Sequence, residues 1–159
     1  MPGARATSVA ARSSASRRRS IHGRSSTTAA TASRSGTRRG RTTSTAPPAS
    51  TETRTRRARA EIAPRLDAAV AHAGTRHAGL TIRGQRTRWA SCSSTGAMSF
   101  NWRLLLAPVA VLDYVIEHEV CHLEVMDHSP RFWALLEERS PGWREHAAWL
   151  RRYGSTLVL

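Results

Sequence analysis

The sequence has no lysine, few cysteines and no long apolar run, and each shortage narrows the possible classes of protein. All 25 basic residues are arginines, which is typical of a GC-rich genome. Two cysteines, Cys92 and Cys121, are too few for the disulfide framework of a small secreted protein. The N-terminus lacks the apolar core of a secretory signal, and the most apolar stretch, residues 104–115, is too short to span a bilayer. We therefore expect a cytoplasmic protein that does not contact a membrane.

The first 60 residues lack aromatic side chains and leucine, and they contain a single acidic residue, Glu52. They carry 14 arginines, so 14 − 1 gives +13, whereas the remaining residues hold 11 arginines and 10 acidic residues, or +1. A segment with so few apolar side chains cannot bury enough surface to offset the entropy cost of ordering. We predict that residues 1–57 are disordered and that residues 58–159 form one small domain.

Three interpretations of this basic segment remain open. An arginine-rich arm can bind nucleic-acid phosphates, and because no aromatic residues are interleaved for base stacking, such contact would be non-specific. A transit peptide has the same composition, rich in arginine and serine and poor in acidic residues. The interpretation that we favour slightly is a misassigned start or a frameshift in a GC-rich coding sequence. A shifted reading frame that encodes strand-like sequence over residues 1–55 would support it.

The most informative motif is His118-Glu119-Val120-Cys121-His122. Two histidines four residues apart project from one face of a helix, so they can bind a single metal ion, with Glu119 placed to activate a water on that metal. At 100° per residue, His122 lies about 40° and Glu119 about 100° from His118, on the apolar side of the helix. The apolar side comprises Val111, Leu112, Val115, Ile116, Leu123, Val125 and Met126. Burying three ionisable groups is costly unless they have partners, and a metal ion would provide one. The alternative is that they are satisfied within the core without a metal.

His128 is the candidate for a third metal ligand. On an unbroken helix it would lie far round from His122, but Ser129-Pro130 reads as the N-cap and first residue of a new helix. A turn at Asp127 and His128 would then bring this imidazole back towards the ion, and three protein ligands leave a position for water. The alternatives are that His128 is an ordinary polar turn residue, or that the third ligand is a glutamate from a later helix. The candidate glutamates are Glu137, Glu138 and Glu145.

The spacing of apolar residues predicts an α+β fold. We expect a short antiparallel hairpin or sheet packed on the helix that carries the motif, with further helices towards the C-terminus. The hairpin, residues 86–103, is the natural surface for pairing with an extended substrate. The expected helices are 61–73, 109–126, one capped by Ser129, and 141–152; the expected strands are 81–83, 85–93 and 98–104.

The sequence between about residues 58 and 152 resembles the YgjP-like metallopeptidases, a zincin family related to SprT-like and WLM proteases. The resemblance rests on several separate stretches in a matching order: residues 82–83, 87–93, 101–104, 107–108, 114–123, 128–129 and 132–133. It implies a small zincin-like domain in which His118, His122 and His128 bind Zn²⁺ and Glu119 is the general base. The first 55 or so residues do not resemble the family's usual β-rich N-terminal part.

Together the motif and the resemblance predict a zinc metallopeptidase that acts on peptide or protein substrates. Two other functions remain open. The protein could be a basic, nucleic-acid-associated protein with a structural or inactive zinc site. It could also be a zinc hydrolase that acts on protein cross-linked to DNA.

Overall fold

The structure is a computed structural model that describes residues 7–10 and 50–157. The sheet has four strands in the order β1-β3-β4-β2, comprising β1 (Thr7–Ala10), β3 (Arg88–Cys92), β4 (Ala97–Asn101) and β2 (Gly79–Arg83). Strand β3 is antiparallel to both β1 and β4, with Ala90 opposite Phe100, whereas β2 runs parallel to β4. Because β1 and β2 occupy its two edges, the predicted hairpin of β3 and β4 lies inside the sheet.

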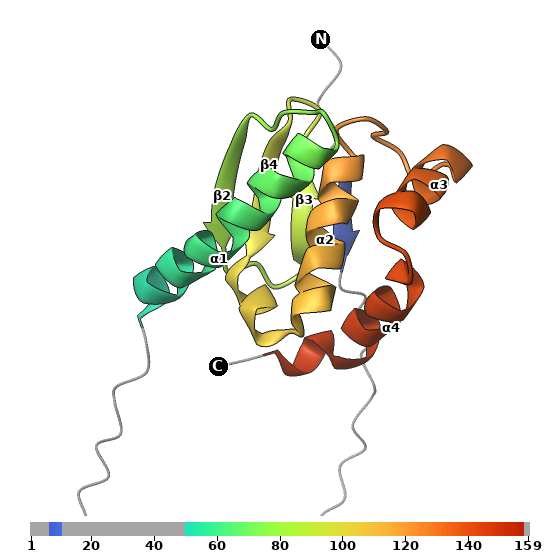
Figure 1. The fold of residues 1–159 in the computed structure, drawn as a ribbon. Coiled ribbons are helices and arrows are strands. Elements are labelled where there is room, and N and C mark those ends of the chain that lie inside the picture. Colours follow the sequence, from blue (N-terminus) through green and yellow to red (C-terminus); the bar gives the residue numbers. More distant parts are fainter. Residues whose placement is uncertain (1–6, 11–49, 158–159) are drawn as a thin grey trace, which may run out of the picture. The chain divides into compact units, whose positions relative to one another are not determined.

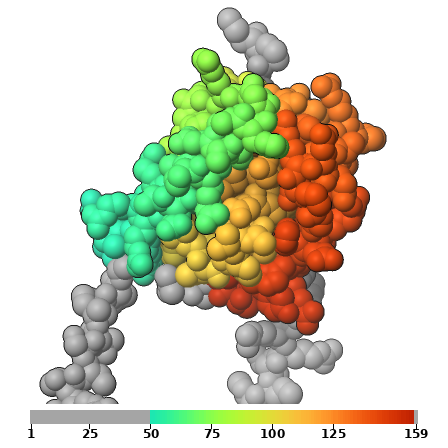
Figure 2. Space-filling model, viewed as in Figure 1, coloured from blue at the N-terminus to red at the C-terminus, as the bar shows by residue number. Residues whose placement is uncertain are grey.

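Two helices, α1 (Thr51–His72) and α2 (Val109–Cys121), lie against the same face of the sheet (Figure 1). Two shorter helices, α3 (Pro130–Arg139) and α4 (Trp143–Tyr153), follow. The space-filling view shows α2 between α1 on one side and the α3–α4 segment on the other (Figure 2). The helix that carries the histidine motif is therefore central to the described part of the chain, and the α+β class expected from the sequence is confirmed.

Helix α1 begins ten residues before the predicted Glu61. Ser50 caps it by accepting a hydrogen bond from the Thr53 amide at 3.2 Å, and Glu52 lies in its first turn, where a carboxylate favours the helix dipole. Buried residues recur at helical spacing along it: Ala58, Ile62, Leu66, Ala69 and Val70. Arginine is a good helix former, so a basic composition alone does not prevent this start.

The predicted domain boundary between residues 57 and 58 consequently falls inside α1. Strand β1 also comes from the segment predicted to be disordered, and it pairs with β3 through backbone hydrogen bonds, which need no apolar composition. Disorder is therefore a wrong prediction for residues 7–10 and 50–57. The remainder of that segment, residues 1–6 and 11–49, lies outside the described residues.

The strand predicted over residues 98–104 ends at Asn101. The buried Asn101 side chain caps the 3₁₀ helix Trp102–Leu106 by accepting from the Arg103 amide at 3.1 Å, and its amide donates to the Gln85 carbonyl at 2.6 Å. Trp102 and Leu104 are buried as predicted, but they reach the core from this 3₁₀ turn. A 3₁₀ helix has three residues per turn whereas a strand alternates every two, so the burial of Trp102 and Leu104 does not by itself identify a strand.

Candidate metal centre

The motif lies at the C-terminal end of α2, where the helix is almost completely enclosed. His118 is 3 % exposed, and Glu119 and His122 are 0 % exposed. The helix ends at Cys121, five residues before the predicted end, and His122 is its C-cap. A tight turn follows, in which the Leu123 amide donates to Val120 O and the Val125 amide to Cys121 O. This early end redirects the chain towards His128.

The structure brings His118, His122 and His128 together. One ring nitrogen from each of the three side chains lies within 4.8 Å of the others. The Nε2 atoms of His118 and His128 are 3.1 Å apart, so one ring donates a hydrogen bond to the other. Two nitrogens bound to one tetrahedral zinc at about 2.1 Å each lie about 3.4 Å apart. The spacing therefore suits three imidazoles that share a single ion.

His122 is oriented by the turn that ends the helix. Its Nδ1 lies 3.0 Å from the carbonyl oxygen of Val125, to which the Nδ1–H group donates. Its Nε2 is buried and has no hydrogen-bond partner within residues 50–157. A metal-binding histidine commonly donates its second ring N–H to a backbone carbonyl in this way. The unpaired buried nitrogen is the atom that a metal ion would satisfy.

Burial keeps all three imidazoles neutral at pH 7. It holds the pKa of His118 well below the ordinary value, and the neighbouring His122 and His128 lower it further. Burial also lowers the pKa of His122, to about 4, against the opposing effect of its bond to Val125 O. The pKa of the more exposed His128 is lowered by burial as well. Neutral rings have free lone pairs, as metal ligation requires.

Phe132 contacts every ring of the cluster and is fully buried. It stacks on His122 with a centroid distance of 4.5 Å, and it makes edge contacts with His118 at 4.8 Å and His128 at 4.7 Å. No motif in the sequence had pointed to Phe132 as a contact of the histidines. The available signal was its position three residues after Ser129 at the start of α3, which turns the side chain back towards the preceding loop.

The predicted start of α3 is confirmed, with Ser129 as N-cap and Pro130 in the first turn. The Asp127 carboxylate accepts a hydrogen bond from the Ser129 amide at 3.1 Å, which tightens the turn that carries His128. The alternative third ligands Glu137, Glu138 and Glu145 are exposed and lie outside the cluster. The turn before Ser129 therefore brings the imidazole of His128 next to the other two histidines, as predicted from Ser129-Pro130.

Glu119 is buried beside α2's neighbouring strand. Burial raises the pKa of the Cys92 thiol in β3 to about 12, and the nearby charge of Glu119 contributes to that rise. The pKa of Tyr114, one turn earlier on α2, is also raised to about 12 by burial, with a smaller contribution from Glu119. Burial likewise raises the pKa of Cys121 to about 11. Both thiols are therefore protonated at pH 7 in the metal-free protein, and neither belongs to the histidine cluster.

A His-Glu-x-x-His helix that receives a third histidine from the following turn defines a metallopeptidase-like site. The family described as "YgjP-like, metallopeptidase domain" matches residues 15–153, so the chain belongs to this family.

A similar solved structure is the metallopeptidase zymogen of Pyrococcus abyssi abylysin, with 24% sequence identity and a TM-score of 0.48 over 60% of this chain and 92% of that chain. No curated protein matches the sequence. Within the described residues, no helix is long and apolar enough to cross a membrane.

Proposed function

We propose that this protein is a zinc-dependent metallopeptidase in which His118, His122 and His128 hold the ion and Glu119 is the general base. The observation that carries the proposal is the convergence of three imidazole nitrogens within 4.8 Å at the buried end of α2. Membership of a metallopeptidase family supports hydrolysis of peptide bonds as the reaction. The cytoplasmic location stays a prediction.

The donor set favours zinc among the common metals. Imidazole nitrogen suits Zn²⁺, whereas Ca²⁺ and Mg²⁺ prefer oxygen ligands. Three protein ligands are typical of catalytic zinc, since structural zinc normally has four. When bound, the ion would supply Lewis acidity that polarises a substrate carbonyl and lowers the pKa of a water molecule.

Glu119 supplies the proton transfer in this proposal. It follows His118 directly on α2 and is fully buried, which restricts the rotamers that its carboxylate can adopt. The carboxylate takes one proton from the attacking water and passes it to the leaving amine, so that the carboxylate is regenerated when the peptide bond breaks. His118, His122 and His128 hold the ion and do not exchange protons in this scheme.

Substitution of Glu119 tests the proposed reaction. We expect Glu119→Gln to keep the metal, because the imidazoles are unchanged, and to lose peptide hydrolysis by at least about 100-fold, the usual minimum contribution of a general base. Hydrolysis of an unstructured protein and zinc content would be measured on the same preparations, with Glu138→Gln as a control at an exposed position. An active Glu119→Gln protein would refute the general-base role.

A nucleic-acid-associated function is the second candidate, and the exposed arginines at the start of α1 favour it. Arg56, Arg57 and Arg59 are all exposed there, and the preceding residues carry most of the net charge. Peptide hydrolysis measured with and without DNA separates the candidates. Activity that requires DNA would support a protease that acts on protein cross-linked to DNA, whereas tight DNA binding without hydrolysis would support a structural or inactive zinc site.

A further inference from the structure

His128 is held differently from the other two histidines. His118 and His122 are buried at the end of a helix, whereas His128 lies exposed in the turn between α2 and α3. An exposed side chain in a turn samples several rotamers, and fixing it in one rotamer costs conformational entropy. A third ligand of this kind binds well only when other contacts orient its ring beforehand.

A series of stacked contacts, which we call the aromatic stack, connects His128 to α4. The stack comprises His128, Trp133, Trp143 and Arg144. The imidazole of His128 stacks on Trp133 with a centroid distance of 5.3 Å and an interplanar angle of 26°. Trp133 in turn stacks on Trp143 at 4.7 Å and 17°. The guanidinium carbon of Arg144 lies 4.7 Å from the centroid of the Trp143 ring.

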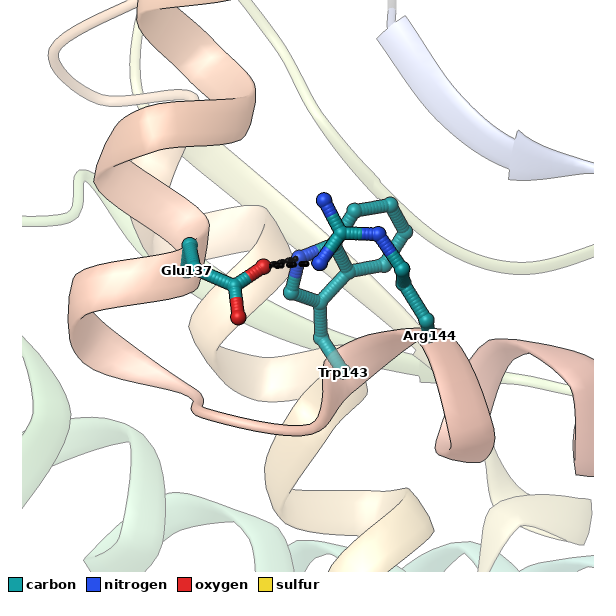
Figure 3. A network of polar contacts seen from close by, with 3 residues as sticks. All are labelled: Glu137, Trp143 and Arg144. Atoms are coloured by element: carbon teal, nitrogen blue, oxygen red, sulfur yellow. Dashed lines mark hydrogen bonds and ion pairs between the residues drawn. The ribbon is translucent and has the colours of Figure 1, made fainter.

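Glu137 fixes the far end of the aromatic stack (Figure 3). Its Oε2 atom accepts a hydrogen bond from the indole N–H of Trp143 at 2.8 Å and a second one from Arg144. Glu137 belongs to α3, and both donors belong to the start of α4, so these bonds join the two helices. A carboxylate that accepts from two donors fixes the indole plane as well as its position.

We infer that Trp133 and Trp143, fixed by Glu137 and Arg144, are positioning residues that orient His128 as the third metal ligand. This inference rests on the proposed metal site. The stack restricts the imidazole to the rotamer that directs its Nε2 towards His118, at 3.1 Å. Partners that orient a metal ligand typically change metal affinity 10–100-fold when they are removed.

Trp149 provides a matched comparison on the same helix. Both Trp143 and Trp149 are half-buried residues of α4, but Trp149 packs against Tyr153 at 5.3 Å. Loss of either indole removes a similar packing surface, whereas only Trp143 belongs to the aromatic stack. A difference in metal affinity between the two substitutions therefore reports on the stack and not on general loss of packing.

The test measures the zinc dissociation constant of the full chain by competition with a chelating dye. We expect Trp143→Ala to weaken zinc binding about tenfold, Trp143→Phe to restore most of the affinity because it keeps a ring, and Trp149→Ala to leave it unchanged. Glu137→Ala should weaken binding by a smaller factor, about threefold, since the Glu137–Arg144 pair is exposed. Glu138→Ala, at an exposed position of the same helix, is the control for Glu137→Ala.

A coupling measurement separates positioning from a general structural role. In the His128→Ala background, Trp143→Ala should cause no further loss of zinc affinity, because the ring that the stack orients is absent. Equal losses in both backgrounds would overturn the inference, and so would unchanged affinity in both Trp143→Ala and Glu137→Ala. If the wild-type chain binds no zinc, both the proposed function and this inference are refuted. If it binds zinc through the three histidines without dependence on Trp143, only this inference fails.

Discussion

His122 illustrates how a single side chain is prepared for ligation by its own backbone. The helix ends at Cys121, and the resulting turn places the Val125 carbonyl 3.0 Å from Nδ1 of His122. That bond fixes the tautomer, so the lone pair is on Nε2, the buried nitrogen. The sequence predicted that His122 lies on the apolar face of the helix, and the structure buries it there. The sequence did not predict the early end of the helix, because apolar residues continue at helical spacing through Val125.

The lowered pKa of His122 predicts how the metal-free protein responds to pH. Its folded-state pKa is about 4 against an ordinary 6.5, so between these values the unfolded chain binds a proton that the folded chain does not. The free energy of unfolding should therefore fall as the pH drops from about 6.5 to 4, by about 3 kcal/mol from His122. Denaturant unfolding with a chelator present checks this result. In His122→Gln, the free energy of unfolding should fall less over this pH range. The same dependence on pH in both proteins would contradict the lowered pKa of His122.

Phe132 should influence metal binding more than its burial alone implies. Phe132→Leu removes the ring that contacts all three imidazoles, and we expect about 1 kcal/mol loss in the free energy of unfolding together with weaker zinc binding. Phe100→Leu is the matched control, since Phe100 is equally buried, in β4. It should lose similar stability and keep its zinc affinity. Equal zinc affinities in the two variants would show that Phe132 is an ordinary core residue.

At the scale of elements, local signals predicted the start of α3 and the end of α1 closely, but they missed the start of α1 and the end of α2. Ser129-Pro130 correctly predicted the start of α3. Ser140-Pro141 predicted the last helix two residues too early, because Gly142 adopts a left-handed conformation with φ of +80° and α4 begins at Trp143. The parallel pairing of β2 with β4 could not be read from the sequence, since strand pairing depends on contacts between distant residues.

The left-handed Gly142 sets the path from α3 into α4 and therefore the position of Trp143. A Cβ atom there meets nothing within 4 Å, so the cost of a side chain comes from the backbone conformation alone. We expect Gly142→Ala to lower the free energy of unfolding by about 1 kcal/mol. Gly142→Asn should lower the free energy of unfolding by less, because asparagine tolerates a left-handed conformation better than alanine does. Thermal unfolding compares the two variants, and equal stability of alanine and glycine would contradict this explanation.

At the scale of the whole molecule, most of the net charge and the candidate metal centre lie in different parts of the sequence. Most of the net charge of +14 precedes residue 61, whereas the candidate metal centre lies between residues 118 and 128. Composition locates this charge directly. It missed β1 and the first ten residues of α1, since backbone pairing and a serine cap can order residues that bury little apolar surface. The family match over residues 15–153 includes most of this basic segment.

Zinc content is the most direct test of the central claim, that one metal ion is held by His118, His122 and His128. Metal analysis of the purified chain should find one zinc per molecule in the wild type and in Glu119→Gln. His118→Ala and His122→Ala should each lose the metal, and His128→Ala should bind it much more weakly. A wild-type chain without zinc, or histidine variants that keep a full equivalent, would contradict the account.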